Sequence, residues 1–395
     1  MHGLKKNTSR FQLIHIADLR TIGGVERILV DFIDQTPHVA HHLILLNKHI
    51  HPNLVHVSQK VSSISSIKHW FNVISLPKHL RKWHLSHLIK KLNADKILVW
   101  NQVIDLKNIQ TSYVYYEHGS AWYDHSEQMI HHCFDQVQSI IAVSHAAKRM
   151  LQLHHHVQQD IQVIHNTLRP SLQLPNVTTR TLATNKRITL GVAGRLVPLK
   201  CIPLLIMTIK HLQQYGVDAY ALIAGVGSEY DSIVQLIQEH DLTDKISLLG
   251  LIDNMQDFYQ QIDLYICTSM HESFGLVCLE AFAYALPVIA ANIDGLPEVI
   301  EHQHNGICIE PSLSIEGYIQ QTRASTRFTQ TIYYPEQDAI GQVTLMDPKV
   351  IAQQVINLLN HPEQYAYMSK MALHTAKHHA PFNQLCKNVL AVLKN

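Results

Sequence analysis

The sequence alternates short apolar runs with amphipathic stretches, in two series separated by a polar segment. Short apolar runs bounded by glycine or polar positions are typical of buried strands, whereas apolar residues three and four positions apart are typical of helices. Strands interleaved with helices predict parallel sheets with helices on both faces. The first series comprises 11–17, 24–33, 41–46, 80–92, 96–100, 113–118 and 139–143, and the second begins with 188–193, 203–215, 219–224, 233–240 and 246–249.

This pattern predicts an α/β protein with two doubly wound domains. We expect an N-terminal Rossmann-like domain over residues 1–165 and a C-terminal one over 187–380. Residues 166–186 are polar, rich in threonine and hold two prolines, so they are interpreted as the interdomain linker. The last stretch, 381–395, predicts one more helix. The segment 312–345 has no assigned role and is interpreted as a loop or hairpin insertion.

Length and charge narrow the class of protein. The 395 residues are too many for one ordinary core and suit two domains of roughly 150 to 200 residues. The formal net charge of +1 argues against a nucleic-acid binder. No apolar run reaches the roughly 20 residues that a bilayer span needs, and the first ten residues lack the apolar core of a signal peptide. A cytoplasmic protein is therefore expected.

Cysteine and histidine usage gives no metal signature. The six cysteines have no CxxC spacing, which predicts reduced structural thiols. Among the thirty histidines, the pair His374 and His378 has the spacing of ligands on one helix face. Compositional bias on solvated faces is the better interpretation of the rest. No Asp-x-Asp run is present, so a reaction that requires no metal or other cofactor is expected.

The most informative stretch is His271–Glu280, in which two carboxylates lie eight positions apart. It follows a predicted buried strand at 263–268 and enters a predicted helix at 274–285, so the turn between them lies at the carboxyl end of a strand, where open α/β sheets bind ligands. Glu272 and Glu280 can each accept two O–H donors of a sugar or ribose. Alternatively, Glu280 is only a helix-start acid that the helix dipole favours, and Glu272 a solvated loop residue.

Flanking motifs continue the pattern. DGLPEVI at 294–300 and NGICIEP at 305–311 follow at the right distance, and together with 272–293 this run resembles the donor-site signature of retaining glycosyltransferases of family 4. GRLVPLK at 194–200 is similar to the basic loop of that family, and GGVER at 23–27 to its glycine-rich acceptor-side loop. The resemblance covers most of residues 11–395. It implies the GT-B fold, in which two Rossmann-like domains flank a cleft and the last helix crosses back to the N-terminal domain.

The resemblance also implies roles for residues of the C-terminal domain. Arg195 and Lys200 would stabilise the diphosphate leaving group, as fixed cations can in the absence of a metal. Glu272 would hold the transferred sugar and Glu280 the donor ribose. Further contacts to the nucleotide-sugar donor would come from backbone groups, some of them in glycine-containing turns. The residues are Phe274, Gly275, Leu276, Gly225, Gly227 and Ile252. These glycine turns are equally compatible with plain strand-to-helix connections. Cys201 stands where the family usually has glycine.

The N-terminal domain offers four further candidates. His118 closes an apolar strand and matches a family histidine beside the reacting sugar, where an imidazole can donate a hydrogen bond or move a proton. Gly24 would let the backbone approach the donor diphosphate, and Asp18 and Gly23 would contact the acceptor. Together with Arg195, Lys200 and Glu272, His118 completes the predicted catalytic set.

The function expected is retaining, metal-independent transfer of a sugar from a nucleotide-diphosphate donor, a UDP-sugar in particular. The expected acceptor is a saccharide or lipid-linked molecule of bacterial lipopolysaccharide or surface polysaccharide synthesis. One alternative is a nicotinamide-dependent oxidoreductase, although no Gly-x-Gly-x-x-Gly follows the first strand. Another is a non-catalytic protein that binds sugar nucleotides.

The segment 68–91 raises the question of membrane contact. It combines two tryptophans with six lysines or arginines, which could attach the protein peripherally to the anionic cytoplasmic face of the inner membrane. The alternative is an ordinary helix whose apolar stripe of Leu80, Trp83, Leu88 and Leu92 packs on the sheet. A helix of the second kind is the preferred interpretation.

Overall fold

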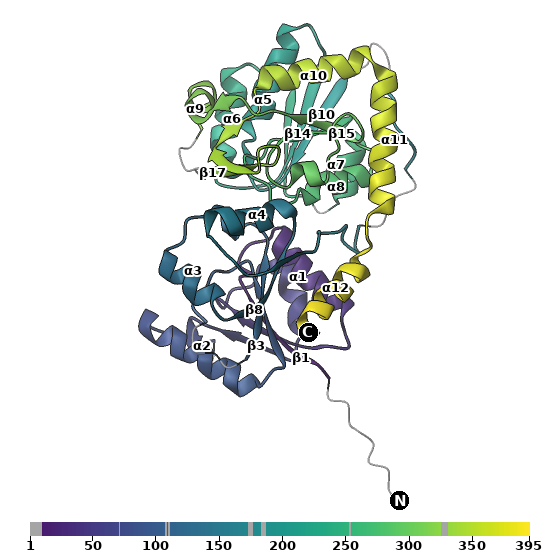
Figure 1. Ribbon diagram of the computed structural model, residues 1–395. Helices are drawn as coiled ribbons and strands as arrows, with labels where there is room; N and C mark the ends of the chain where they lie inside the picture. Colours follow the sequence, from purple (N-terminus) through teal and green to yellow (C-terminus); the bar gives the residue numbers. More distant parts are fainter. Residues whose placement is uncertain are drawn as a thin grey trace, which may run out of the picture. The chain divides into compact units, whose positions relative to one another are not determined.

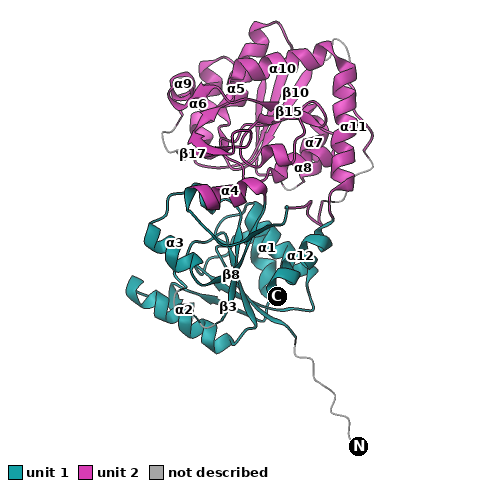
Figure 2. Cartoon of the chain, in the orientation of Figure 1, with its two compact units in different colours: residues 1–143, 154–165, 381–395 teal, residues 144–153, 166–380 magenta. Residues whose placement is uncertain are grey.

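The computed structural model describes residues 10–70, 72–106, 109, 111–172, 177–182, 187–252, 254–324 and 331–395. The chain divides into two compact units, shown in different colours in Figure 2. Unit 1 holds residues 1–143, 154–165 and 381–395, and unit 2 holds residues 144–153 and 166–380. Parts of the predicted linker, 173–176 and 183–186, lie outside the described residues.

Unit 1 is built on one sheet with the strand order β5-β4-β3-β2-β1-β6-β7-β8-β9 among the described residues. All pairings are parallel except those of the hairpin-like edge, where β3, β4 and β5 pair antiparallel. The strands are β1 (Gln12–Ala17), β2 (Ala40–Leu45), β3 (Ser63–Ser66), β4 (His69–Trp70), β5 (Ile74–Ser75), β6 (Lys96–Trp100), β7 (Tyr113–Glu117), β8 (Val137–Ala142) and β9 (Ile161–Val163).

The helices of unit 1 are α1 (Gly24–Gln35), α2 (Lys78–Leu92), α3 (Glu127–Phe134) and the C-terminal α12 (Phe382–Lys394), with the 3₁₀ segments η1 (Pro52–Gln59) and η2 (Ser120–Trp122). Helix α12 is part of unit 1 although it is the last element of the chain, and it packs against α1 (Figure 1). Its apolar face, which includes Leu385, Val389 and Leu393, is buried. Burial of this face, rather than helix propensity, is what stabilises a helix of this length.

Buried polar side chains link three strands in the core of unit 1. Trp100 Nε1 donates to His15 Nδ1 at 3.0 Å, so the neutral His15 ring carries its proton on Nε2. That nitrogen lies 2.9 Å from His41 Nδ1, and His41 Nε2 lies 3.0 Å from the carbonyl oxygen of Thr36. The chain of bonds is therefore satisfied when both imidazoles are neutral.

Unit 2 contains a parallel sheet of strand order β12-β11-β10-β13-β14-β15, shown in part in Figure 1. The register runs parallel through all five neighbouring pairs. The strands are β10 (Ile188–Ala193), β11 (Ala219–Ala224), β12 (Ile246–Gly250), β13 (Leu264–Cys267), β14 (Val288–Ala291) and β15 (Gly306–Ile309). As the hydrophobic runs predict, these strands are mostly buried.

The helices of unit 2 cover the sheet. They are α5 (Pro203–Gln214), α6 (Tyr230–Glu239), α7 (Met255–Gln261), α8 (Leu276–Ala283), α9 (Ile315–Thr322), α10 (Pro348–Asn360) and α11 (Pro362–His378), with η3 (Pro198–Lys200) and η4 (Leu296–Glu298). Helix α4 (His145–His154) belongs to unit 2 up to Leu153. Two features fix the start of α10. Proline occupies its first position, and the Asp347 side chain accepts from Lys349 N at 2.8 Å.

The segment 312–345, which the sequence left unassigned, contains regular structure. It holds α9 and two antiparallel strand pairs, β16 (Leu313–Ser314) with β19 (Thr344–Leu345) and β17 (Thr331–Tyr334) with β18 (Ala339–Gln342). Residues 325–330 lie outside the described residues. The β17–β18 hairpin is anchored to α4, because Arg149 Nε and Nη2 donate to the two carboxylate oxygens of Asp338 at 2.7 Å each.

The apolar stripe predicted for α2 is wrong at Leu80 and Trp83, whereas Leu88 and Leu92 are half-buried. Leu80 and Trp83 are 39 % and 54 % exposed, and the buried residues of the helix are His84, Leu85 and Ile89. The His84 ring stacks on Trp70 of β4 at a centroid distance of 5.3 Å, so an imidazole takes a core position that the pattern assigned to leucine and tryptophan. Within the described part of the chain, no helix combines the length and hydropathy of a bilayer span.

Candidate active site

The predicted catalytic residues of unit 2 flank the point at which the strand order of the sheet reverses. From β10 the chain moves to β11 and β12 on one side, and later to β13, β14 and β15 on the other. Arg195 and Lys200 follow β10, and Glu272 follows β13, its immediate neighbour. Open parallel sheets bind ligands outside the carboxyl ends of the strands at such a switch point. The structure therefore brings three predicted residues to the edge where a ligand is expected.

Lys200 and Glu272 form an ion pair at this edge. Lys200 Nζ lies 2.6 Å from Glu272 Oε2 and donates to Ser269 Oγ at 3.2 Å. The two side chains are 21 % and 18 % exposed, so the pair is sheltered but reachable from solvent. Burial lowers the pKa of Lys200, yet the adjacent carboxylate outweighs burial and the net pKa is raised. Burial likewise raises the pKa of Glu272, and Lys200 outweighs it, so the net pKa is lowered.

Hydrogen bonds to backbone oxygens of the basic loop, residues 194–200, hold it against the loop that follows β13. Thr268 Oγ1 donates to Lys200 O at 2.6 Å, and Met270 N donates to Leu199 O at 3.0 Å, which connects the loops after β10 and β13. Arg195 is exposed on the same loop, and its charge lowers the pKa of Lys200 slightly, as the last of several causes. Cys201, which stands where the family usually has glycine, is buried and adopts a left-handed φ of 43°. The backbone conformation thus survives without glycine.

Glycine is required where the loops after β10 and β11 meet. A Cβ atom at Gly225 would lie 1.8 Å from Gly194 O, and one at Gly227 would lie 2.2 Å from Leu196 O. Gly225 N donates to Gly250 O at 2.7 Å, which ties in the loop that carries the half-buried Ile252. Close backbone packing alone therefore explains why both positions require glycine. Their predicted contact with a nucleotide stays a prediction.

Asp294 holds the loop that carries Glu272. Its buried carboxylate accepts from His271 Nδ1 at 2.9 Å and from Glu272 N at 3.2 Å. Gly295 N donates to Glu272 O at 3.1 Å, and a Cβ atom at Gly295 would lie 2.2 Å from Ser273 O. The Asp-Gly pair of the quoted DGLPEVI motif thus positions both the backbone and a side chain of the donor-side loop.

The remaining donor-side candidates surround the start of α8. Phe274 is buried, Gly275 caps the helix with a φ of 91°, and Leu276 is its first residue. Glu280 lies one turn further along the helix and is partly exposed, and its Oε2 accepts from Tyr259 Oη at 3.1 Å. Burial first, and then the Glu280 charge, raise the pKa of Tyr259 well above its usual value. Sequence reasoning missed Tyr259, because its hydroxyl is recognisable as a partner only once α7 and α8 are placed together.

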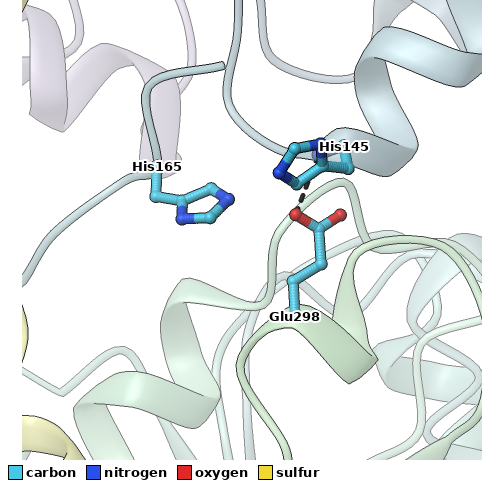
Figure 3. Close-up of side chains that lie close together, drawn as sticks. All are labelled: His145, His165 and Glu298. Carbon is cyan, nitrogen blue, oxygen red and sulfur yellow. Dashed lines mark hydrogen bonds between the residues drawn. The ribbon is translucent and has the colours of Figure 1, made fainter.

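Glu298 is a second residue that the sequence did not single out. Its carboxylate accepts from His145 N at 2.8 Å, at the amino end of α4 (Figure 3). It also accepts from Ala146 N at 2.8 Å. Ser144 Oγ, just before the helix, donates to Ser273 O at 2.5 Å. A carboxylate at this position satisfies helix N–H groups and complements the helix dipole. The start of α4 is in this way fixed to the donor-side loop of the same unit.

In unit 1, Asp18, Gly23 and Gly24 lie around the start of α1. Asp18 lines a cavity of about 30 Å³ together with residues such as Glu26 and Asn101. Its carboxylate is paired with Arg20, with Oδ2 at 2.6 Å from Nη2. Gly23 is the cap of α1, and Gly24 is the exposed first residue of the helix.

His118 is buried in unit 1 beside aromatic rings. It stacks on Trp100 at a centroid distance of 5.6 Å and lies 4.2 Å from the Tyr116 ring. Burial lowers the pKa of His118 to about 3, so the imidazole is neutral near pH 7. Asn101 Oδ1 accepts from the backbone N–H groups of His118 and Ser120 at 2.9 Å each, which fixes the turn. A neutral imidazole in this position suits hydrogen bonding to a hydroxyl rather than charge stabilisation.

One family model and several known proteins are similar to part of the chain. Residues 178–323 match the model of the family described as Glycosyl transferases group 1. The chain is 40 % identical over 94 residues to the N-acetyl-alpha-D-glucosaminyl L-malate synthase of Bacillus anthracis, which is 24 % of this chain and 25 % of the relative. It is 25 % identical over 248 residues to the lipopolysaccharide core biosynthesis glycosyltransferase LpsD of Rhizobium meliloti, which is 61 % of this chain and 67 % of the relative.

The fold is shared with a solved structure that contains a nucleotide sugar. The Anabaena protein Alr3699/HepE in complex with UDP-glucose superposes with a TM-score of 0.71 at 16 % identity, and the match covers 97 % of this chain and 99 % of that one. The GT-B fold expected from the sequence is confirmed. The two matches to the relatives above span between a quarter and two thirds of the relatives' lengths.

Proposed function

We propose that the protein transfers a sugar from a nucleotide-diphosphate donor to a hydroxyl acceptor, because residues 178–323 match the model of the family described as Glycosyl transferases group 1. The observation that carries the proposal is the Lys200–Glu272 pair at the switch point of the unit 2 sheet. A cation and a carboxylate 2.6 Å apart match the two ends of a sugar diphosphate, one anionic and one rich in hydroxyl groups.

Lys200 and Arg195 stabilise the diphosphate as the glycosidic bond breaks. In the absence of donor, Lys200 is held by Glu272 and Ser269, so its ammonium group is already positioned before phosphate arrives. When the donor binds, phosphate oxygens replace Glu272 as the partner of Lys200, and the released carboxylate accepts hydroxyl groups of the sugar. Arg195, which is exposed, supplies a second cation. Each such fixed donor contributes roughly 3 to 4 kcal/mol to a transition state of this kind.

Glu280 and Tyr259 form the ribose side of the proposed site. The tyrosine hydroxyl donates to one carboxylate oxygen, which leaves acceptor capacity for ribose hydroxyl groups. His118 of unit 1, neutral because of its burial, is suited to donate to or accept from a substrate hydroxyl. With the two cations neutralising the leaving group, the proposed reaction needs no metal.

The nucleotide, the acceptor class and the stereochemistry are proposed by analogy with similar proteins. UDP is proposed as the nucleotide, supported by the UDP-glucose bound to the Anabaena protein of the same fold. A saccharide or lipid-linked acceptor of lipopolysaccharide or polysaccharide synthesis is proposed from the name of the Rhizobium relative. Retention of anomeric configuration, with attack on the face that the leaving phosphate vacates, is adopted from the resembled family.

The test is a screen of UDP-sugars for thermal stabilisation, followed by a UDP-release assay with and without a chelator. A true donor at a hundred times its dissociation constant adds about 2.7 kcal/mol of stability. Replacing Lys200 by Ala should lower turnover about 100- to 1,000-fold, whereas Lys245→Ala, at an ion pair with Asp218 in the same unit, should leave it unchanged. Stabilisation without any UDP release would favour the non-catalytic alternative, and stabilisation by a nicotinamide nucleotide alone would refute the proposal.

A further inference from the structure

Unit 1 contains a long segment without any acidic residue. From residue 35 to residue 94 the chain has no aspartate or glutamate, eight lysines and arginines, and ten histidines. The whole protein carries a formal net charge of only +1, so positive charge is concentrated in this segment. A local excess of this kind produces a strong field even on a nearly neutral protein.

The same segment exposes large apolar side chains. Val73, just before β5, and Ile74, the first residue of β5, are 74 % and 65 % exposed, and Trp83 of α2 is 54 % exposed. On α2, Leu80, Trp83, His87 and Lys90 are spaced three, four and three positions apart, which places them on one side of the helix. The buried Leu85 and Ile89 lie on the opposite side of the helix.

Ring stacking fixes the hairpin to the helix. The Trp70 ring of β4 and the Trp83 ring of α2 stack at a centroid distance of 5.6 Å and an interplanar angle of 22°. His87 continues the stack, 5.7 Å from Trp83. Ile74 is the strand partner of Trp70, so the exposed end of the hairpin lies beside the ring that stacks on α2. We call these exposed residues of the hairpin and of α2 the α2 surface: Val73, Ile74, Leu80, Trp83, Lys90 and Lys91.

The cations near this surface are concentrated. The pKa of His69 in β4 is lowered, first by partial burial and then by the positive charges of Lys48, His49, Arg81 and Lys68. Lys82 is paired with Asp105 at 2.6 Å, and Arg81 Nε donates to Leu76 O at 3.1 Å, so these two are engaged in holding α2. Lys78, Lys90 and Lys91 are exposed.

We propose that the α2 surface docks unit 1 on an anionic lipid bilayer, with Val73 and Ile74 in the acyl boundary, Trp83 at the headgroup level and Lys90 and Lys91 on lipid phosphates. Exposed aliphatic side chains at a turn favour a membrane over a nucleic acid, because phosphates and bases give a valine–isoleucine turn no apolar medium to enter. Tryptophan side chains prefer the headgroup level of a bilayer, and lysine side chains extend to the lipid phosphates. The inference rests on the proposed function only in giving that function a lipid-borne acceptor.

The experiment is co-sedimentation of the full chain with vesicles of phosphatidylcholine alone or mixed with phosphatidylglycerol, at low and high salt. We expect binding that requires the anionic lipid and weakens with salt. Lys90→Gln with Lys91→Gln should weaken it about fivefold for each charge removed. Val73→Ser with Ile74→Ser should weaken it at least about tenfold without changing the salt dependence.

Matched variants in unit 2 control for general effects. Lys349→Gln with Lys370→Gln removes two exposed charges, and Val350→Ser changes an aliphatic side chain that is 37 % exposed. These variants should bind vesicles like the wild type. Equal binding by all variants, equal binding to neutral vesicles, or capture by RNA in preference to vesicles would each overturn the proposal. Vesicle binding requires no turnover, so an inactive but vesicle-bound protein would count against the proposed reaction alone.

Discussion

Asp294 and Tyr333 hydrogen-bond to each other twice. Asp294 N donates to Tyr333 O, and Tyr333 N donates to Asp294 Oδ1, both at 2.9 Å. The second oxygen of the same carboxylate accepts from His271 Nδ1 and Glu272 N. Because Tyr333 belongs to β17, one buried carboxylate connects the hairpin of the 312–345 segment to the loop that presents Glu272. The segment without an assigned role is thus physically coupled to the candidate active site.

Replacing Asp294 by Gly should impair turnover although it relieves backbone strain. Asp294 has a φ of 50°, which glycine adopts more easily. The loss of a charged acceptor for three donors outweighs this gain, and we expect a net destabilisation of about 2 kcal/mol. Glu272 would lose its fixed place, so kcat should fall about 10- to 100-fold with a smaller change in KM for the donor.

Gln303→Gly is the matched control for the Asp294 variant. Gln303 is exposed and has a φ of 60°, so glycine there removes the same backbone strain without removing a buried acceptor. It should leave both stability and turnover close to wild type. Equal kinetic behaviour of the two variants would show that Asp294 does not position Glu272.

Glu298→Ala should loosen the start of α4. The variant leaves the N–H groups of His145 and Ala146 without their acceptor and removes a favourable charge at the helix start, at a cost of about 1 to 2 kcal/mol. Hydrogen exchange measured by mass spectrometry should show faster exchange in 144–150. The exposed Glu301, three residues further on, supplies the control: Glu301→Ala should leave exchange in this segment unchanged.

We expect Arg180, which lies in the segment interpreted as a linker, to contribute strongly to the free energy of unfolding. Its guanidinium donates to the carbonyl oxygens of Tyr259, Ile262 and Tyr284 at 2.9, 2.6 and 3.0 Å. Burial lowers the pKa of Arg180. Arg180→Met would leave three carbonyl groups unsatisfied, and we expect a loss of about 2 to 4 kcal/mol in urea unfolding.

The exposed Arg187 provides the comparison for Arg180. It pairs with Asp218 while both side chains are 53 % exposed, so Arg187→Met should cost no more than about 0.5 kcal/mol. Similar losses for the two variants would mean that the three carbonyl contacts of Arg180 contribute little.

The local sequence pattern was sufficient to predict the strands and the loops that carry Lys200 and Glu272. Apolar runs that end in glycine or polar turns mark the carboxyl edge of a parallel sheet. The pattern failed where the partner is distant in sequence. Glu298 meets α4 across about 150 positions, and nothing near either end signals the contact. It failed again in α2, where the buried imidazole of His84 stacks on Trp70 and displaces Trp83 to the surface. Hydropathy alone assigns these two side chains the opposite way.

Buried histidines predict that unit 1 loses stability in mild acid. Burial lowers the pKa of His41 to about 4, and burial followed by the charges of His41 and His42 lowers that of His15 well below its usual value. Below about pH 6.5 these histidines are protonated in the unfolded chain but stay neutral in the folded core. The free energy of unfolding therefore falls as the pH drops. For His41 alone the loss approaches about 3 kcal/mol by pH 4.

Tryptophan fluorescence can follow this transition, because all four tryptophans, residues 70, 83, 100 and 122, lie in unit 1. Urea unfolding should give midpoints that fall steeply from pH 6.5 to pH 4. In His41→Gln the amide oxygen still accepts from His15 and the amide nitrogen still donates to Thr36 O, so proton uptake on unfolding near pH 5 should decrease by about one proton. Above pH 7.5 both proteins should show the same pH dependence. An unchanged proton uptake in the variant would mean that His41 is already protonated in the folded protein, contrary to the neutral chain of bonds from Trp100 to Thr36.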